Sequence, residues 1–379
     1  MRIQSLPNAG LLIEADGVRL LCDPWFTDGA YQGAWAIWPQ PLKDPVRELG
    51  KVNAIYISHI HPDHYDQTFL RQYLQYWGDT PIVCGLQSLT DALHADGFPS
   101  AQYVSAGWGI DNVGCRIIPN TTYRAPFDTA LAVRCGSESL INYNDNPTDP
   151  LLPTADMVTD TTQLKALMDF CGGSPTVAYL PFAGASSYPQ RFTFPSEAEC
   201  RQAATLKQHR YLKQFLKTVD ILQPKYVVPF AGEYWLQGPL AKYNHLRGQT
   251  DATEAVALCK QAILPAAGAW FDTTTGQATA VRTKPYDPSE AMRDINARGF
   301  TGYQFAKDYS YAHEWVDDDA LETFSPKKPL LVMDDRYMLG LISRRYHWND
   351  ALISSHVGIL DPIESLTNDM FEALEAWHL

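Results

Sequence analysis

The chain has 379 residues, a hydrophobic content of 45%, a charged content of 19% and a formal net charge of −13. These values exclude a disordered chain, and the acidic balance argues against nucleic acid as a partner because phosphate binding needs a basic surface. No window approaches the length of a membrane span and the start lacks a signal peptide, so we expect a cytoplasmic protein without a membrane partner. Seven cysteines scattered singly predict reduced thiols rather than disulfides.

The first part of the chain predicts β-hairpins that give way to alternating strands and helices. Residues 10–14 and 18–22 flank Ala15-Asp16-Gly17, a typical hairpin turn, and Asp23-Pro24 ends the second strand because proline cannot continue a central strand. An apolar run over 52–57 predicts a buried strand. Further strands are predicted over 81–84, 103–104, 115–119, 130–134, 139–142, 176–180 and 226–229, and helices over 66–78, 87–96, 160–169 and 198–219. This order predicts an α/β layered sandwich.

The chain changes character after residue 283. Residues 284–288 contain two prolines and predict a linker or bend. Beyond it, the runs over 330–333 and 338–342 are strand-like, and a final helix is predicted over 365–377. We expect residues 1–283 to form a catalytic domain and residues 284–379 to form an extension that packs on that domain or completes it.

A cluster of ligand-type side chains follows the strand over 52–57. The sequence Ser58-His59-Ile60-His61-Pro62-Asp63-His64 brings three imidazoles and a carboxylate into the loop at the end of that strand. Imidazole nitrogen and carboxylate oxygen suit zinc, iron or manganese better than calcium or magnesium. Because so many histidines seldom cluster as core residues, the pattern predicts a metal site on His59, His61, Asp63 and His64.

Asp145 is the expected bridging carboxylate of this site. It follows the strand over 139–142 in a loop rich in amide side chains, where a bare carboxylate has little other purpose. The alternative is an aspartate that only stabilises a turn. Later histidines are harder to assign. His356 is the best candidate for a later ligand, although a histidine without a ligand role is the commoner outcome in such a segment.

The order of these features resembles the metallo-β-lactamase superfamily: a hairpin ending in Asp23-Pro24, then the histidine motif, then Asp145 at a strand end. Within that superfamily the chain is most similar to the catalytic part of the CMP-N-acetylneuraminate hydroxylase family and its bacterial relatives. The segments that carry this likeness are Asp23-Pro24-Trp25-Phe26, Tyr56-Ile57-Ser58-His59, Phe127-Asp128-Thr129, 142–145, Pro229-Phe230-Ala231-Gly232 and His347-Trp348-Asn349 with Ala351. The resemblance implies a metallo-β-lactamase-like αββα sandwich, one or two iron ions, and electrons supplied through a Rieske iron–sulfur domain.

The chain departs from that family in three places. It has no Rieske domain. Arg124 stands where a ligand histidine is expected four residues before Asp128, and the segment 233–239 lacks the expected later histidine. A reduced site on the histidine motif and Asp145 is therefore plausible, with Glu233 or His356 replacing a lost ligand.

Three functions follow from this site. The first, which we favour, is an iron-dependent oxygenase or oxidase of a small polar metabolite, such as a sugar nucleotide or a biosynthetic intermediate. Its electrons would come from an electron-donor protein as a partner or from the substrate itself. The second is a zinc hydrolase of an ester, lactone, amide or phosphodiester, in which Asp63 is a ligand or the general base. The third is a non-enzymatic scaffold. Asp63 and Asp145 are the expected catalytic groups of either enzyme.

Four further residues are expected to bind the substrate. Trp25 belongs to an aromatic loop, and Tyr188 and Arg191 belong to the segment 186–191; both segments could wall a substrate. Arg124 and Arg191 could hold a carboxylate or phosphate through paired hydrogen bonds. The alternatives are core packing for the aromatic residues and an ordinary surface position for the arginines.

Overall fold

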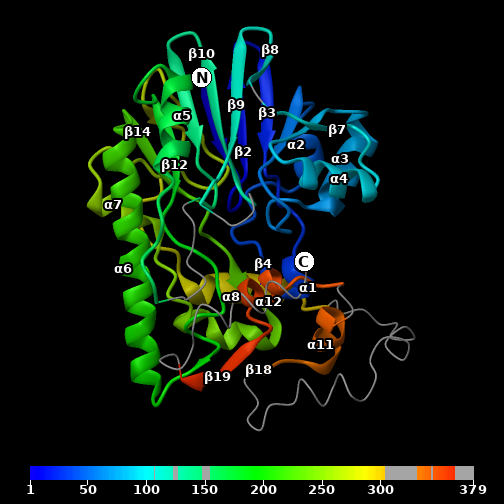
Figure 1. Cartoon of the computed structure of the whole chain (residues 1–379), viewed down its shortest axis with the longest axis vertical. Helices are drawn as coiled ribbons and strands as arrows, with labels where there is room; N and C mark the ends of the chain where they lie inside the picture. The colour runs from blue at the N-terminus through cyan, green and yellow to red at the C-terminus, as the bar shows by residue number, and fades with distance from the viewer. Residues whose placement is uncertain (106, 123–126, 147–153, 304–330, 343–344, 363–379) are drawn as a thin grey trace.

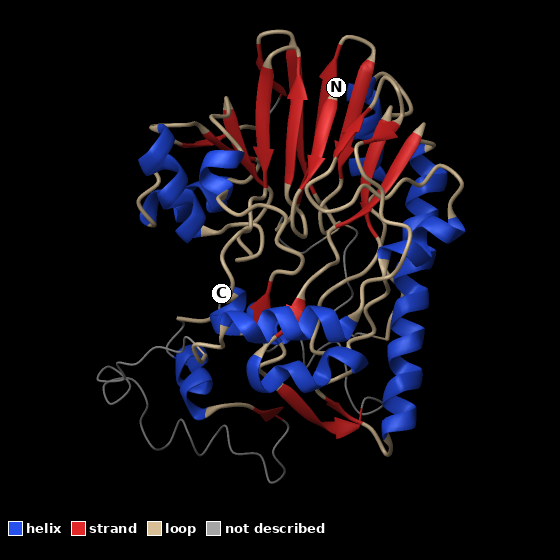
Figure 2. Cartoon of the chain, turned by 180° about the vertical axis from the view of Figure 1, so that it is seen from behind, coloured by secondary structure: helices blue, strands red, loops and turns tan. Residues whose placement is uncertain are grey.

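Two β-sheets pack face to face and carry helices on their outer faces (Figures 1 and 2). The computed structural model describes the chain apart from residues 106, 123–126, 147–153, 304–330, 343–344 and 363–379. The arrangement confirms the predicted αββα sandwich. Within the described residues, no helix is both long enough and apolar enough to cross a membrane.

The first sheet has eight strands in the order β17-β16-β1-β2-β3-β5-β6-β7. The predicted hairpin forms its centre, and β3, β5, β6 and β7 run parallel. The strands are β1 (Arg2–Ser5), β2 (Leu11–Ala15), β3 (Val18–Cys22), β5 (Ala54–Ile57), β6 (Ile82–Cys84), β7 (Ala101–Tyr103), β16 (Trp270–Asp272) and β17 (Gln277–Ala278). Helices α3 (Gln67–Trp77) and α4 (Gln87–Ala95) cover its outer face.

The second sheet has six strands in the order β14-β12-β11-β10-β9-β8. They are β8 (Gly107–Ile110), β9 (Val113–Pro119), β10 (Thr129–Cys135), β11 (Glu138–Asn142), β12 (Val177–Pro181) and β14 (Tyr226–Phe230). Strands β11, β12 and β14 run parallel. The outer face is covered by α5 (Thr161–Cys171), α6 (Glu197–Leu222) and α7 (Ala252–Leu258).

Alternation along the strands explains the layers. In β10, Leu131 and Val133 point into the core between the sheets, whereas Ala130 and Ala132 point toward the helices. Side chains of a strand alternate between faces, so a strand with apolar residues throughout is buried on both sides. The small alanines let α5 approach the sheet closely.

The C-terminal part of the described chain lies in the lower half of Figure 1, below the two sheets. Its elements are α8 (Pro288–Arg298), β18 (Leu331–Val332), α11 (Asp335–Ile342), α12 (Trp348–Ser354) and β19 (Gly358–Pro362), and β18 and β19 form a small sheet with β13 (Phe192–Thr193). The short elements nearby are α1 (Ala30–Gly33), β4 (Trp35–Ala36), β15 (Trp235–Leu236) and η1 (Gly238–Leu246), whereas α2 (Pro45–Glu48) lies beside α3 (Figure 1).

One predicted element of this part is wrong. The run over 338–342 was expected to be strand-like, but it belongs to α11. Tyr337 and Leu341 are both buried and lie four residues apart, so the run presents one apolar face at helical spacing. The helix predicted over 365–377 lies outside the described residues, and the domain boundary at residue 283 stays a prediction.

Candidate metal centre

The histidine motif occupies the loop that leaves the carboxyl end of β5. The amides of His64 and Tyr65 both donate to the carbonyl of His61, at 2.9 and 2.8 Å, so the loop closes as a tight turn. Asp66 then caps α3 by accepting from the amide of Phe69 at 2.9 Å. Because a buried strand and a capped helix hold both ends, the side chains between them have fixed positions.

Two ring nitrogens face each other at the centre of the site. His59 Nε2 lies 2.7 Å from His61 Nδ1. The other nitrogen of His59, Nδ1, lies 2.9 Å from Ser58 Oγ and 3.1 Å from Asp128 Oδ1. Burial and the neighbouring imidazoles of His64 and His61 hold the pKa of His59 well below its usual value, so this ring is neutral.

The outer nitrogen of His61 has a partner of its own. His61 Nε2 lies 2.7 Å from Asn349 Oδ1, an oxygen that can only accept, so this nitrogen carries the ring proton. With a proton on each outer nitrogen, both inner nitrogens, His59 Nε2 and His61 Nδ1, present lone pairs across 2.7 Å. Such a pair is favourable only when a cation or a proton lies between the rings.

His64 repeats the pattern on the other side of the loop. Its Nδ1 lies 3.1 Å from Asp23 Oδ2, while Asp23 Oδ1 accepts from the amide of Ser58 at 2.8 Å. Its Nε2 is fully buried and has no hydrogen-bond partner among the described residues, but it lies 3.6 Å from Asp63 Oδ2 and 3.4 Å from Asp145 Oδ2. Burial acts to lower the pKa of His64, but these two carboxylates raise it well above its usual value.

The two carboxylates complete the set. Asp63 is buried and accepts from Asn8 Nδ2 and from the hydroxyl of Tyr31, each at 2.8 Å. The side chain of Asp145 is 37% exposed to solvent. Burial acts to raise the pKa of Asp145, but the nearby charge of His64 lowers this pKa overall.

The structure brings together all five side chains predicted to bind metal. One ligand atom each from His59, His61 and Asp145 lie within 4.8 Å of one another, and Asp63 and His64 border the same point. Each imidazole is anchored on one nitrogen and leaves the other facing the centre, as metal-binding histidines do. The fully buried Nε2 of His64 and the paired lone pairs show that a cation fits here. The donors are nitrogen and oxygen only, which suits iron, zinc or manganese.

The aromatic loop contributes a different residue from the one predicted. Trp25 is 1% exposed, packs against Trp35 with ring centres 6.3 Å apart, and donates to the carbonyl of Thr27. Its position favours core packing over substrate binding. Tyr31 of the same loop reaches the centre instead, through its hydroxyl to Asp63 and its ring, 6.0 Å from that of His61.

Tyr188 and Arg191, which were also predicted to bind the substrate, make the contacts described here with residues other than the predicted ligands. The ring of Tyr188 packs against Phe192, and its carbonyl accepts from Lys207 Nζ at 2.9 Å. Arg191 donates to the hydroxyl of Tyr243 at 2.8 Å. Arg124 lies outside the described residues. The substrate-binding roles of these residues stay predictions.

Neither proposed replacement ligand is placed among the histidines. His356 Nε2 donates to the carbonyl of Tyr31 at 3.0 Å. Glu233 forms an ion pair with Arg282. Their nitrogen and carboxylate are therefore engaged elsewhere, and the structure does not support either residue as a metal ligand.

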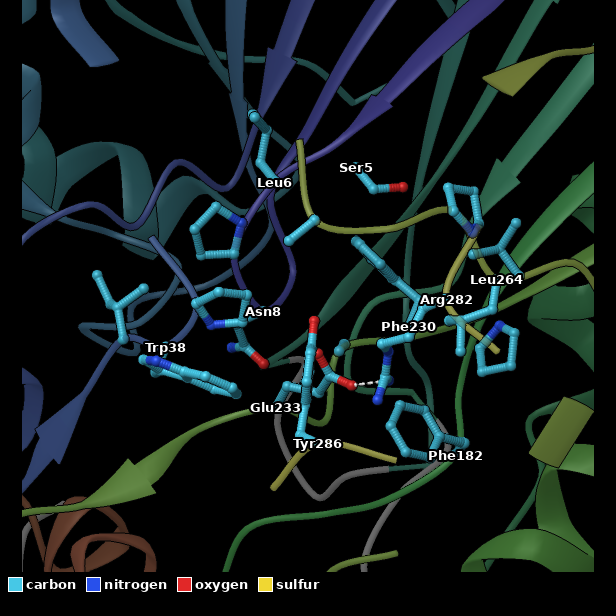
Figure 3. A pocket seen from close by; sticks show the side chains of 18 residues that line it. Ser5, Leu6, Asn8, Trp38, Phe182, Phe230, Glu233, Leu264, Arg282 and Tyr286 are labelled. Atoms are coloured by element: carbon cyan, nitrogen blue, oxygen red, sulfur yellow. Dashed lines mark hydrogen bonds and ion pairs between the residues drawn. The ribbon is translucent and has the colours of Figure 1, made fainter. Parts of the chain in front are cut away.

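Glu233 and Arg282 line a cavity of about 50 Å³ beside the centre (Figure 3). Asn8 also lines it and is the residue that donates to Asp63, so one side chain separates the cavity from a metal ligand. Burial raises the pKa of Glu233 to about 7, although Arg282 opposes this shift. A cavity of this size holds a few water molecules rather than a substrate.

Several residues of the centre escaped the sequence reasoning. They are the anchors rather than the ligands: Asn8, Asp23, Asp128, Asn349 and Asp350, the last with Oδ1 4.0 Å from His61 Nε2. Asp23, Asp128 and Asn349 lie in segments that carry the family resemblance. Their presence in those segments was therefore a usable signal, whereas Asn8 offered none.

Fold and site together define a metal-binding protein of the metallo-β-lactamase fold. Residues 2–125 match the family model described as "Beta-lactamase superfamily domain", so the chain carries such a domain. The solved structure of a possible metal-dependent hydrolase from Veillonella parvula superposes with a TM-score of 0.51 at 14% identity, covering 72% of this chain and 98% of that one. This likeness confirms the fold class.

The similarity in sequence leads to a more particular group. The chain is 28% identical over 253 residues to the cytidine monophosphate-N-acetylneuraminic acid hydroxylase of Mus musculus, covering 64% of this chain and 41% of the hydroxylase. It is 27% identical over 269 residues to a Mycobacterium tuberculosis protein provisionally named a Rieske 2Fe-2S iron-sulfur protein, covering 66% of this chain and 48% of that one. The predicted resemblance is confirmed as a distant one, and the chain spans less than half of each relative.

Proposed function

We propose that the protein is an iron-dependent oxygenase or oxidase that acts on a small polar metabolite. The observation that carries the proposal is the donor set: three anchored imidazoles and two carboxylates around one point, with no thiolate among them. Mixed nitrogen and oxygen donors with open positions suit iron that activates oxygen. The distant similarity to a hydroxylase favours this class over others.

The residues of the centre have separable roles in such a reaction. His59, His61, His64, Asp63 and Asp145 would hold iron, which would supply oxygen activation when bound. Asn8 and Tyr31 keep Asp63 oriented by donating to its two oxygens. Asp145, which is partly exposed, is positioned to accept a hydrogen bond or a proton from a substrate hydroxyl at the mouth of the site.

One wall of the site is aromatic. The ring of Phe127 lies 5.5 Å from that of His59 and 4.9 Å from that of His61. This side chain would exclude water from one side of the reacting group. Arg124 remains our prediction for holding a carboxylate or phosphate of the substrate.

Electrons would come from a partner protein or from the substrate itself. All seven cysteines are free in the described chain, and the one cluster of metal-ligand type found there is the centre itself. A relative carries a Rieske name, so an iron–sulfur protein is the partner class to test first.

A zinc hydrolase is the second candidate. Asp63 lies beside His64 in a position suited to a ligand or to a general base, which is the arrangement a metal-activated water needs. The substrate would be an ester, lactone, amide or phosphodiester.

The metal content of protein purified without added metal and without air decides between these functions. We expect iron at one or two ions per chain and oxygen uptake with a chemical reductant. Zinc without oxygen uptake would support the hydrolase. No metal, even after reconstitution with iron and zinc, would overturn both.

A matched pair of variants ties the metal to this centre. His61→Ala is expected to remove most of the metal and all activity while leaving the fold largely intact, because His61 is buried at the site and not in the apolar core between the sheets. His245→Ala changes a histidine that is 52% exposed and should keep both. A His61→Ala protein with full metal content and activity would contradict the site.

A further inference from the structure

We propose that Asn349, in the C-terminal extension, is a positioning residue of the metal centre that sets which nitrogen of His61 faces the metal. The inference rests on the proposed metal centre but not on the class of reaction. Asn349 Oδ1 lies 2.7 Å from His61 Nε2, the nitrogen on the far side of the ring from His59. The two residues are 288 positions apart in the chain.

The contact determines the state of the imidazole. A neutral histidine carries one proton, and the nitrogen without it is the one that binds metal. An amide oxygen can only accept, so it holds the proton on Nε2 and leaves the lone pair on Nδ1. That lone pair faces the centre at 2.7 Å from His59 Nε2. Without Asn349, His61 can move its proton to Nδ1 and lose the ligand.

The outer nitrogens of the other two histidines, His59 and His64, are contacted by residues of the sandwich. Asp128 and Ser58 contact the outer nitrogen of His59, and Asp23 contacts that of His64. These partners lie in loops that border the sheets. Among the described residues, the near partners of His61 Nε2 are Asn349 at 2.7 Å and Asp350 at 4.0 Å, both on α12. The extension therefore holds the outer nitrogen of one of the three imidazoles.

Several contacts hold Asn349 in this place. Its amide donates to His347 Nδ1 at 3.1 Å, which caps the start of α12. Trp348 and Ala351 are buried, and the carbonyl of Leu352 accepts from the amide of Ser187 at 2.5 Å. The first turn of α12 is thus fixed on both sides. A side chain with a fixed backbone can orient a ligand, whereas one on a loose segment cannot.

The extension also reaches a second ligand through the aromatic loop. His356 donates to the carbonyl of Tyr31, and the hydroxyl of Tyr31 donates to Asp63. The metal centre is therefore incomplete in a protein that lacks the extension, although every ligand lies before residue 146.

Cobalt binding tests the inference without relying on activity. In the full chain we expect Asn349→Leu, which removes the acceptor at similar size, to weaken Co²⁺ binding 10- to 100-fold in competition with a chelator, the range found for partners of metal-bound histidines. Asn349→Asp keeps the acceptor and should retain most of the affinity. Asn112→Leu is the control, since Asn112 donates to Asp16 at the surface.

The outcomes separate this inference from the proposed function. The inference would be overturned if folded Asn349→Leu protein bound Co²⁺ with an affinity within about twofold of that of the unchanged protein, since a loss of about 10-fold or more is expected. If Asn349→Leu does not fold, Asn349→Ser decides by the same criterion. The visible spectrum of bound Co²⁺ should also change in Asn349→Leu and not in Asn112→Leu. Failure of the unchanged protein to bind Co²⁺ would overturn the centre itself.

Discussion

The sandwich and the C-terminal extension contribute to the centre in different ways. The sandwich supplies all five proposed ligands and the anchors of His59 and His64. None of the proposed ligands comes from the described residues of the extension, but Asn349 contacts His61 and His356 contacts Tyr31. Ligands thus come from the region whose strands are buried on both faces, and orientation is shared with the region that packs beneath it.

The two regions also differ in how they are held together. The core between the sheets draws on strands from both sheets. The described residues of the extension contribute to two small clusters instead, one with Tyr337, Leu341, Trp348, Ala351 and Val357 and one with Ala291 and Ile295. A region with few buried apolar contacts opens at lower free energy than the rest of a protein. We therefore expect the extension to open before the sandwich, with loss of the His61 anchor and retention of the ligands.

The largest effect is expected from the anchor within the sandwich. Asp23→Asn keeps an oxygen for the amide of Ser58 but turns an amide nitrogen toward His64 Nδ1. His64 Nδ1 must then accept a hydrogen bond, so the ring proton moves to Nε2, and Nε2 no longer has a free lone pair for the metal. We expect metal affinity to fall about 10- to 100-fold, measured by chelator competition. Asp44→Asn, at the exposed start of α2, is the control.

If Asp23→Asn and Asn349→Leu reduce affinity equally, the extension is as much a part of the centre as the sandwich. If only Asp23→Asn reduces affinity, the metal centre depends on the sandwich and not on the extension.

The stability of the extension is expected to depend on pH through His356. Burial lowers the pKa of His356 to about 4, with Arg191 adding to this and Asp334 and the carbonyl of Tyr31 opposing it. The unfolded segment takes up a proton near pH 6.5 and the folded one does so only near 4, so stability is present above pH 6.5 and is lost as the pH falls toward 4. At pH 5 the loss should be about 1–2 kcal/mol.

Hydrogen exchange of the amides of α12 and β19 at pH 7.5 and pH 5 measures this change, with β5 as the internal reference. His356→Gln should reduce the difference between the two pH values. The part that remains is expected from His347 at the start of α12, whose pKa burial also lowers. Equal acid sensitivity in β5 and α12 would show that the extension does not open separately.

The sandwich was predictable because its signals are local. The hairpin turn, the alternation of strands and helices, and the histidine motif after β5 can each be recognised within a short window of sequence. The run over 338–342 was not, because a short apolar run fits a strand and a buried helix equally well. Strands β16 and β17 were missed because they are two or three residues long. Strand β16 is defined by pairing with β1, far away in the chain, and β17 by pairing with β16.

The candidate ligands could be proposed from the sequence and the residues that contact them could not, for the same reason. His59, His61, Asp63 and His64 lie within six residues, and their spacing alone indicates metal. The contact between Asn349 and His61 spans 288 positions and joins two ordinary residue types. Only the folded chain shows which amide lies beside which ring.

The smallest expected effect concerns the link from the extension to Asp63. Tyr31→Phe removes a buried hydrogen bond to Asp63, and Tyr65→Phe removes a matched one to Asp96, away from the centre. Each should cost about 1 kcal/mol of unfolding free energy. Only Tyr31→Phe should also weaken metal binding, by about fivefold, since Asp63 keeps the hydrogen bond from Asn8. If both variants bind metal like the unchanged protein, Tyr31 packs against the centre without orienting Asp63, and the extension acts on the centre through Asn349 alone.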